Sequence, residues 1–134
     1  MAGYTTVPLI RKLGIKEGVR LLLVNAPAGY LKLTGRLPRG VELVSSNAAE
    51  VDIIQFFATS MEELELHLPA LAGQMKHNGM LWVSWYKKAA GIPTDVTEDY
   101  IRQTAIALGL VDIKVCAIDN RWSALKLVYR KSNR

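Results

Sequence analysis

The sequence predicts a three-layer α/β fold, in which a mostly parallel sheet ends in an antiparallel hairpin. Three observations lead to this prediction. Short apolar segments that fit buried strands alternate with segments whose apolar residues recur at helical spacing. The last two apolar segments are separated by Asp119-Asn120, a dipeptide typical of turns. No linker, repeat or low-complexity segment interrupts residues 1–134, so we expect a single domain.

The first third of the chain contains short elements only. Apolar residues within 7–13 recur at helical spacing, and Gly14 is a natural stop after such a helix. Residues 19–24 are typical of a buried strand, and residues 41–44 predict a brief second strand. Glycines and a proline between these strands leave room for a short helix around residues 31–33.

The middle of the chain predicts a buried strand, a helix and a further strand. Residues 51–58 are apolar enough for a strand that is covered on both faces. Residues 60–63 form a capping box, which predicts the start of a helix. Pro69 lies inside this helix and should kink or split it, and residues 78–79 should end it before a strand over 80–85.

The last third predicts one helix and the hairpin. Asp95 and Thr97 are rival N-caps for the helix, which should stop at Gly109. Residues 122–129 form the second strand of the hairpin. In the first strand, apolar and polar residues alternate, so Cys116 is expected on its polar face. The alternating apolar residues are Val111, Ile113 and Val115.

Composition restricts the classes of protein that remain. The single cysteine, Cys116, cannot form an internal disulfide, and no apolar stretch is long enough to cross a membrane, so we expect a cytoplasmic protein without membrane contact. The net charge of +5 is compatible with acidic partners. The basic residues are scattered along the sequence and no run is interleaved with aromatic residues, which argues against nucleic acid as a partner.

The residues most suited to binding follow the predicted strands. In open α/β sheets, ligands lie beyond the carboxyl ends of the strands. This rule defines a candidate ligand-binding crevice, in which Trp85 offers a flat surface and the lysines offer positive charge for a phosphate or carboxylate. The alternative is that the aromatic residues pack in the core and the lysines are merely solvated. The residues of this strand-end crevice are Asn25, Ala26, Pro27, Gly29, Thr59, Ser60, Trp85, Lys87 and Lys88.

A second candidate is the hairpin turn, where Asp119, Arg121 and Trp122 could contact a protein partner. Trp and Arg are frequent at such contacts. The alternative is that Trp122 folds back onto the sheet. No metal site is expected, because His67 and His77 have no cysteine or carboxylate at ligand spacing.

The order of elements resembles the class I methyltransferase fold, a Rossmann-like family that binds S-adenosylmethionine. The resemblance extends over residues 14–130. It is seen in the lead into the first strand (14–20, GIKEGVR), in the central strand (51–54, VDII) and in the segment 75–81 (MKHNGML), where the family usually has a Lys-Pro-Gly-Gly turn. The terminal hairpin is similar as well.

Two departures from this family bear on function. Its loop of the form acid-x-Gly-x-Gly-x-Gly would fall on Leu23, Asn25, Pro27 and Gly29, of which only Gly29 matches. Its ribose-binding acid is replaced by residues 45–47, Ser-Ser-Asn. In addition, only six residues join the second strand to the third, so the sheet is trimmed on one side or the second strand pairs unusually.

The chain as a whole also resembles a small bacterial domain family of unknown function, which implies no activity. The residues that resemble it are Ala2-Gly3-Tyr4, Asn25-Ala26-Pro27, Trp85-Tyr86-Lys87-Lys88-Ala89, the strand 111–117 and residues 122–127.

Together these features predict a non-catalytic methyltransferase-like domain that binds a protein or a small acidic ligand and needs no cofactor. The alternative is a divergent methyltransferase that binds S-adenosylmethionine or another nucleotide, with Asn25, Ala28 and Gly29 in contact with it and Trp85 stacked on its base. A third hypothesis, binding of a nucleic-acid phosphate backbone, rests on the scattered lysines and arginines alone.

Overall fold

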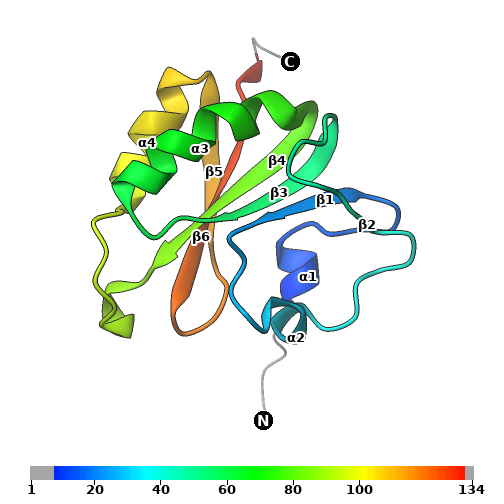
Figure 1. The fold of residues 1–134 in the computed structure, drawn as a ribbon, viewed down its shortest axis with the longest axis horizontal. Coiled ribbons are helices and arrows are strands. Elements are labelled where there is room, and N and C mark those ends of the chain that lie inside the picture. Colours follow the sequence, from blue (N-terminus) through cyan, green and yellow to red (C-terminus); the bar gives the residue numbers. More distant parts are fainter. Residues whose placement is uncertain (1–7, 132–134) are drawn as a thin grey trace.

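The computed structural model describes residues 8–131, which form a six-stranded sheet with helices on both faces (Figure 1). The opening of the chain, including Val7 of the predicted first helix and Ala2-Gly3-Tyr4, lies outside these residues. The helices are α1 (Leu9–Lys12), α2 (Tyr30–Thr34), α3 (Met61–Gln74) and α4 (Glu98–Ala107), with a 3-10 helix, η1, at Lys88–Ala90. The strands are β1 (Arg20–Val24), β2 (Glu42–Leu43), β3 (Val51–Phe57), β4 (Met75–Tyr86), β5 (Leu110–Ala117) and β6 (Trp122–Tyr129).

The strand order is β2-β1-β3-β4-β6-β5, and the predicted fold class is confirmed. Strands β1 to β4 run parallel to one another, whereas β6 runs antiparallel to both β4 and β5. Two-residue β2 is an edge strand of this sheet and pairs only with β1. The connection from β2 to β3 therefore crosses β1 without a helix, as the short segment 45–50 predicted for a trimmed sheet.

The two faces of the sheet have separate cores. Helices α3 and α4 pack on one face, where Leu64, Leu68 and Ile101 are fully buried. Helices α1 and α2 cover the other face through Leu13 and Tyr30. The α1 end is fixed to the sheet because the indole nitrogen of buried Trp82 donates to the carbonyl of Leu13 (3.0 Å).

The boundary between α3 and β4 was predicted wrongly. Helix α3 runs unbroken through Pro69 but ends at Gln74, and β4 begins at Met75 rather than at residue 80. The register explains the difference. Val51 pairs with Met75 and Ile53 with Met80, so a bulge takes up the extra residues of β4, including Asn78 and Gly79. The turn dipeptide therefore lies inside an irregular strand and does not end the helix.

The side-chain alternation of β5 was also predicted wrongly. A register shift between Asp112 and Lys114 moves the following residues to the opposite face from the one expected. Cys116 is consequently buried, at 8% exposure, whereas Ile113 and Val115 are about half exposed (54% and 49%). Burial raises the pKa of the Cys116 thiol, although the charges of Lys12 and Lys114 act in the opposite direction.

The predicted capping residues begin both long helices. Ser60 accepts a hydrogen bond from the backbone amide of Glu63 (3.1 Å), as expected for the capping box. Of the two candidate N-caps for α4, Thr97 caps the helix: its hydroxyl accepts a hydrogen bond from the amide of Tyr100 (3.1 Å). Asp95 instead accepts a hydrogen bond from the Met61 amide (2.8 Å), so it caps α3 across the sheet end.

Three polar side chains are buried beneath α1 and α2. Gln55 and Ser84 are completely buried, and Tyr30 is 3% exposed. Gln55 pairs with Trp82 across the β3–β4 ladder, and Ser84 pairs with Phe57, which is on the same face. Within residues 8–131, neither amide atom of Gln55 nor the two hydroxyls has a protein hydrogen-bond partner. An unpartnered buried polar group lowers stability.

Replacing Gln55 with leucine, which has a similar volume, should therefore stabilise the fold. We expect the free energy of unfolding to rise by about 1–2 kcal/mol, because the amide is no longer desolvated without a partner. Urea denaturation of the wild type and Gln55→Leu measures the change. Exposed Gln103→Leu is the control and should change stability by less than about 0.5 kcal/mol. A less stable Gln55→Leu protein would contradict this interpretation.

Candidate functional site

A cavity of about 500 Å³ lies at the carboxyl end of β4, next to the start of α4. We call it the β4 cavity. It is open on one side and is formed by the end of β4, the turn that follows it and the segment leading into α4. Its lining residues are Trp85, Tyr86, Lys87, Lys88, Ile92, Pro93, Thr94, Val96, Thr97 and Glu98.

The two lysines lie in the turn that follows β4. The backbone amide of Lys87 donates to the carbonyl of Arg121 (2.8 Å), which holds this turn against the hairpin turn. η1 begins at Lys88 and is followed by Gly91, whose positive φ of 69° lets the chain reverse direction. Among the ion pairs of the described residues, none involves Lys87 or Lys88.

Aromatic residues support the floor of the β4 cavity. Tyr86 stacks on Trp122, with ring centroids 4.1 Å apart and planes inclined by 29°. Trp122 in turn packs edge-on against Phe57. Trp85 is partly buried and packs against the core on the α3 and α4 face. These contacts restrict the aromatic side chains, so the cavity has a fixed apolar wall beside two cations.

The opposite wall is fixed by threonine hydroxyls. Thr94 donates to the carbonyl of Thr59 (2.8 Å) and accepts from the amide of Val96 (3.2 Å). Thr97 caps α4. The acidic group in this wall is Glu98, and it is paired with Arg102. Hydrogen bonds that Arg102 donates, first to Glu98 and then to Asp112, raise the pKa of Arg102. The negative charge of Glu98 is thus compensated, while the two lysines remain uncompensated.

Thr59 and Ser60, which sequence reasoning placed in the strand-end crevice, serve instead to cap α3. Glu63 accepts hydrogen bonds from the backbone amide and hydroxyl of Thr59 (2.8 and 3.2 Å). Ser60 and Asp95 are also bonded to the first turn, so the amides of Met61 and Glu63 are satisfied by the protein's own oxygens. An external anion at this helix end would have to displace them.

The loop after β1 holds the remaining residues of the predicted crevice. Asn25 has a positive φ of 57° and Gly29 one of 85°, so the chain turns sharply into α2. Ala26 packs against the core beneath α2. This loop, residues 25–29, does not line the β4 cavity. The structure therefore brings Trp85, Lys87 and Lys88 together and leaves the β1 loop apart from them.

Of the two alternatives for the hairpin turn, the structure agrees with the one in which Trp122 folds back onto the sheet. Trp122 is 5% exposed and folds back onto the sheet, so it cannot present its ring to a partner. Asp119 accepts hydrogen bonds from the amides of Arg121 and Trp122 (2.8 and 2.9 Å), which defines the turn. Arg121 is exposed.

The two histidines do not share an element. His67 lies on α3 beside Phe56, and His77 lies on β4 beside Tyr129. No group of three or more His, Cys, Asp or Glu side chains placed to hold a metal ion occurs within residues 8–131. No helix in the described part of the chain is long and apolar enough to cross a membrane.

Sequence reasoning missed the second wall of the β4 cavity. This wall comes from Ile92, Pro93, Thr94 and the start of α4. A signal was available: Gly91 and Pro93 mark a loop directly after a strand that ends at the carboxyl edge, where ligands bind.

Comparisons with solved structures reveal related folds. A putative type 11 methyltransferase from Sulfolobus solfataricus has a TM-score of 0.66 at 16% identity and covers 94% of this chain and 92% of its own. An S-adenosylmethionine-dependent methyltransferase from Aquifex aeolicus has a TM-score of 0.64 at 19% identity, with coverages of 89% and 86%. Magnesium protoporphyrin IX methyltransferase from Synechocystis, with bound S-adenosylhomocysteine, has a TM-score of 0.60 at 11% identity, with coverages of 91% and 78%.

These similarities establish a methyltransferase-like, Rossmann-like fold for the chain. At such low identity they show the fold alone. No protein-family model and no curated protein sequence matches the chain.

Proposed function

We propose that this protein is a non-catalytic methyltransferase-like domain that binds a small acidic ligand in the β4 cavity. The observation that supports this most directly is the pairing of two uncompensated cations, Lys87 and Lys88, with the aromatic wall at Trp85. A volume of about 500 Å³ lies within the usual range for small-molecule sites. A small aromatic carboxylate or phosphate ester would place its ring against the apolar wall and its charged group beside the lysines.

The loop after β1 supports a role without methyl transfer. In the resembling family this loop approaches the donor through glycines and begins with an acid, but here Leu23, Asn25 and Pro27 occupy those positions. Pro27 has no amide hydrogen to donate to a ligand. At the position of the family's ribose-binding acid, the side-chain oxygen Oδ1 of Asn47 accepts a hydrogen bond from the Ser45 hydroxyl (2.7 Å). A ribose would have to compete with this bond.

The alternative is a divergent methyltransferase that binds S-adenosylmethionine. The left-handed conformations of Asn25 and Gly29 favour it, because they preserve a sharp turn at the carboxyl end of β1. On this alternative, Asn25→Ala and Gly29→Val should both abolish binding of S-adenosylhomocysteine. Unchanged affinity in both variants would exclude a donor site in the loop.

The proposed ligand class can be tested with phthalate and phenyl phosphate as probes. We expect saturable binding by isothermal titration calorimetry, and the double variant Lys87→Gln/Lys88→Gln should bind at least about tenfold more weakly, because each lost charge-assisted contact contributes on the order of 1 kcal/mol. The double variant Arg130→Gln/Lys131→Gln has the same net charge and should bind as the wild type does. If neither probe binds, or if both variants bind equally, the β4 cavity is not an anion site.

A further inference from the structure

Four lysines that are far apart in the sequence lie together on the sheet face that α1 covers. Lys114 on β5 is directly opposite Lys126 on β6 in the antiparallel register. Lys126 also pairs with Trp82, whose indole bonds to the end of α1, so both lysines share the α1 face. Lys16 follows α1 and its charge acts on Lys126. Lys12, on α1, acts together with Lys114 on Cys116. We call these four residues the lysine cluster.

Among the described residues, no carboxylate forms an ion pair with the lysine cluster. Within residues 8–131 the ion pairs use Arg20, Lys76 and Arg102 as cations, and none uses a lysine of the cluster. Asp112 is on β5 but on the other face, where it pairs with Arg102 (3.1 Å). Glu17 is a neighbour of Lys16 in the sequence and is exposed.

The lysines of the cluster repel one another, and this repulsion affects the pKa of Lys126. Burial, followed by the charges of Lys114 and Lys16, lowers the pKa of Lys126. Like charges placed opposite each other in a sheet are destabilising. The arrangement becomes favourable when an anion lies against the cluster.

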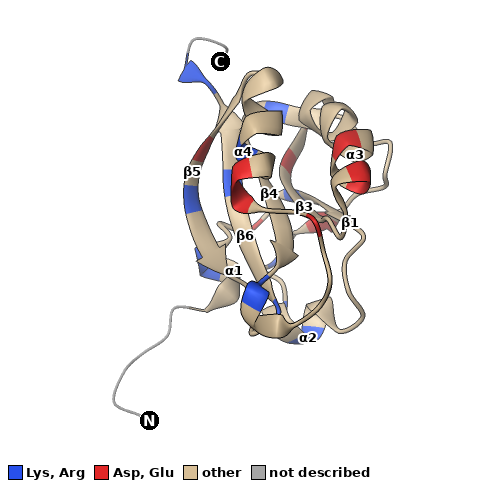
Figure 2. Cartoon of the chain, turned by 90° about the vertical axis from the view of Figure 1, so that its left-hand side faces the viewer, with Lys and Arg blue, Asp and Glu red and all other residues tan. Residues whose placement is uncertain are grey.

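The helices on the two faces of the sheet differ in charge. Helices α1 and α2 contain basic residues and no acidic ones, whereas α3 contains Glu62, Glu63 and Glu65 without a lysine or arginine. Figure 2 shows the acidic segments of α3 and α4 and the basic segments of β5 and α2; β5 also carries one acidic segment, Asp112. The lysine cluster therefore lies on the side of the sheet whose helices are basic, although its members are scattered in the sequence.

We propose that the lysine cluster binds the phosphate backbone of a nucleic-acid duplex. Cores of protein interfaces are rich in aromatic residues and poor in lysine, which is the reverse of this surface. None of the large apolar side chains that are exposed within residues 8–131 is aromatic, so stacking on unpaired bases has no support here. A duplex backbone needs only positive charge at a suitable spacing.

The test uses the full chain with a fluorescent duplex of about 20 base pairs, as DNA and as RNA, and measures anisotropy at several salt concentrations. If the four lysines neutralise four phosphates, affinity should fall about a hundredfold between 50 and 200 mM salt. The variant Lys16→Gln/Lys114→Gln changes two exposed side chains. It should weaken binding at least about tenfold and reduce the magnitude of the log–log salt slope by about 1.8.

Two controls separate this site from a general charge effect. Arg130→Gln/Lys131→Gln removes two exposed cations that follow β6 and lie outside the lysine cluster, and it should bind within about twofold of the wild type. Lys16→Arg/Lys114→Arg should retain binding. Preference for DNA or for RNA identifies which duplex supplies the phosphates. The proposal is overturned by no binding at 50 mM salt, by equal weakening in both glutamine variants, or by tighter binding of single strands or polyglutamate than of duplex.

Discussion

Replacing Gly79 with alanine is expected to lower the free energy of unfolding by about 3 kcal/mol, because the new methyl group would overlap the backbone. A Cβ at this position would lie 2.9 Å from the carbonyl oxygen of Asp52 and 3.0 Å from that of Val51. Both oxygens belong to β3, which pairs with β4 at the bulge. Relief would require the two central strands to separate.

Gly73→Ala provides the matched control for this prediction. Gly73 lies in α3, and a Cβ there would meet no atom within 4 Å. Alanine is the better helix former, so this variant should be more stable than the wild type by about 0.5–1 kcal/mol. Urea denaturation of both variants measures the two changes. Equal stability of the two alanine variants would show that β3 and β4 do not approach as closely as the structure requires.

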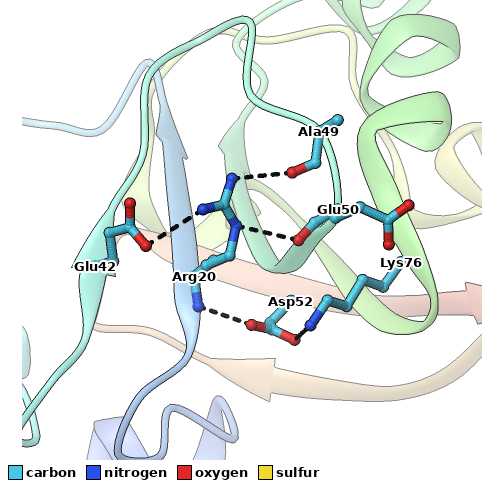
Figure 3. Close-up of polar contacts among 6 residues, drawn as sticks. All are labelled: Arg20, Glu42, Ala49, Glu50, Asp52 and Lys76. Atoms are coloured by element: carbon cyan, nitrogen blue, oxygen red, sulfur yellow. Dashed lines mark hydrogen bonds and ion pairs between the residues drawn. The ribbon is translucent and has the colours of Figure 1, made fainter.

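Replacing Arg20 with alanine should destabilise the protein by about 2 kcal/mol, since its side chain secures the crossover from β2 to β3. The guanidinium donates to the carbonyls of Ala49 and Glu50 (3.0 and 3.3 Å). It also pairs with Glu42 on β2 (3.2 Å), as Figure 3 shows. These contacts tie the short connection between β2 and β3 to the start of β1.

The control for Arg20→Ala is Arg36→Ala, which removes an exposed arginine and should change stability by less than about 0.5 kcal/mol. Thermal and urea unfolding compare the two variants. Hydrogen exchange should also accelerate at residues 44–50 in Arg20→Ala, because the segment loses its anchor. A loss of stability without faster exchange in this segment would contradict the role assigned to Arg20.

The same network makes stability depend on pH through Asp52. Burial favours the neutral acid, but the Arg20 amide (2.8 Å), the Lys76 ammonium (2.9 Å) and the charge of Arg20 outweigh it and lower the pKa of Asp52. A lowered folded-state pKa adds stability above the unfolded value of about 3.9, and this stability is lost as the pH falls through the folded-state pKa.

The variant Asp52→Asn tests this dependence. The stability difference between wild type and variant should be constant above about pH 5 and should shrink as the pH falls below about 4. Urea denaturation from pH 7 to pH 2.5 measures it. A difference that grows in acid would mean that the pKa of Asp52 is raised in the folded state.

Local signals in the sequence were sufficient for most elements of the fold. The central strand β3 is a nearly continuous apolar segment. The capping box fixes the start of α3 through a hydrogen bond between Ser60 and Glu63, which are three residues apart in the sequence. Both signals act within a few residues, so they do not depend on the tertiary arrangement. The C-terminal hairpin could also be predicted from a local signal, because Asp119 and Asn120 are typical of turns.

The errors arose where pairing between strands overrides local pattern. Gly79 lies in the bulge of β4 and does not end α3. The register shift in β5 places Cys116 on the buried face and not on the expected polar face. Neither is encoded by the periodicity of one strand, because each depends on the register of its partner.

The candidate site was predictable only in part. The rule for strand ends identified Trp85, Lys87 and Lys88, which the β4 cavity brings together with residues 92–98. The rule could not show that Thr59 and Ser60 are engaged in capping α3, because Asp95 reaches that helix across 34 residues of sequence. Nor could scattered positions reveal that Lys114 and Lys126 are opposite each other.

The most direct test of the proposed function is thermal unfolding with and without S-adenosylmethionine and S-adenosylhomocysteine. A ligand present at a hundredfold excess over its dissociation constant stabilises a protein by about 2.7 kcal/mol, which for a domain of this size raises the Tm by about 5–15 °C. A domain that does not use the methyl donor should show no shift with either compound up to millimolar concentration. A saturable rise of that size would contradict the non-catalytic account and would establish a donor-binding protein.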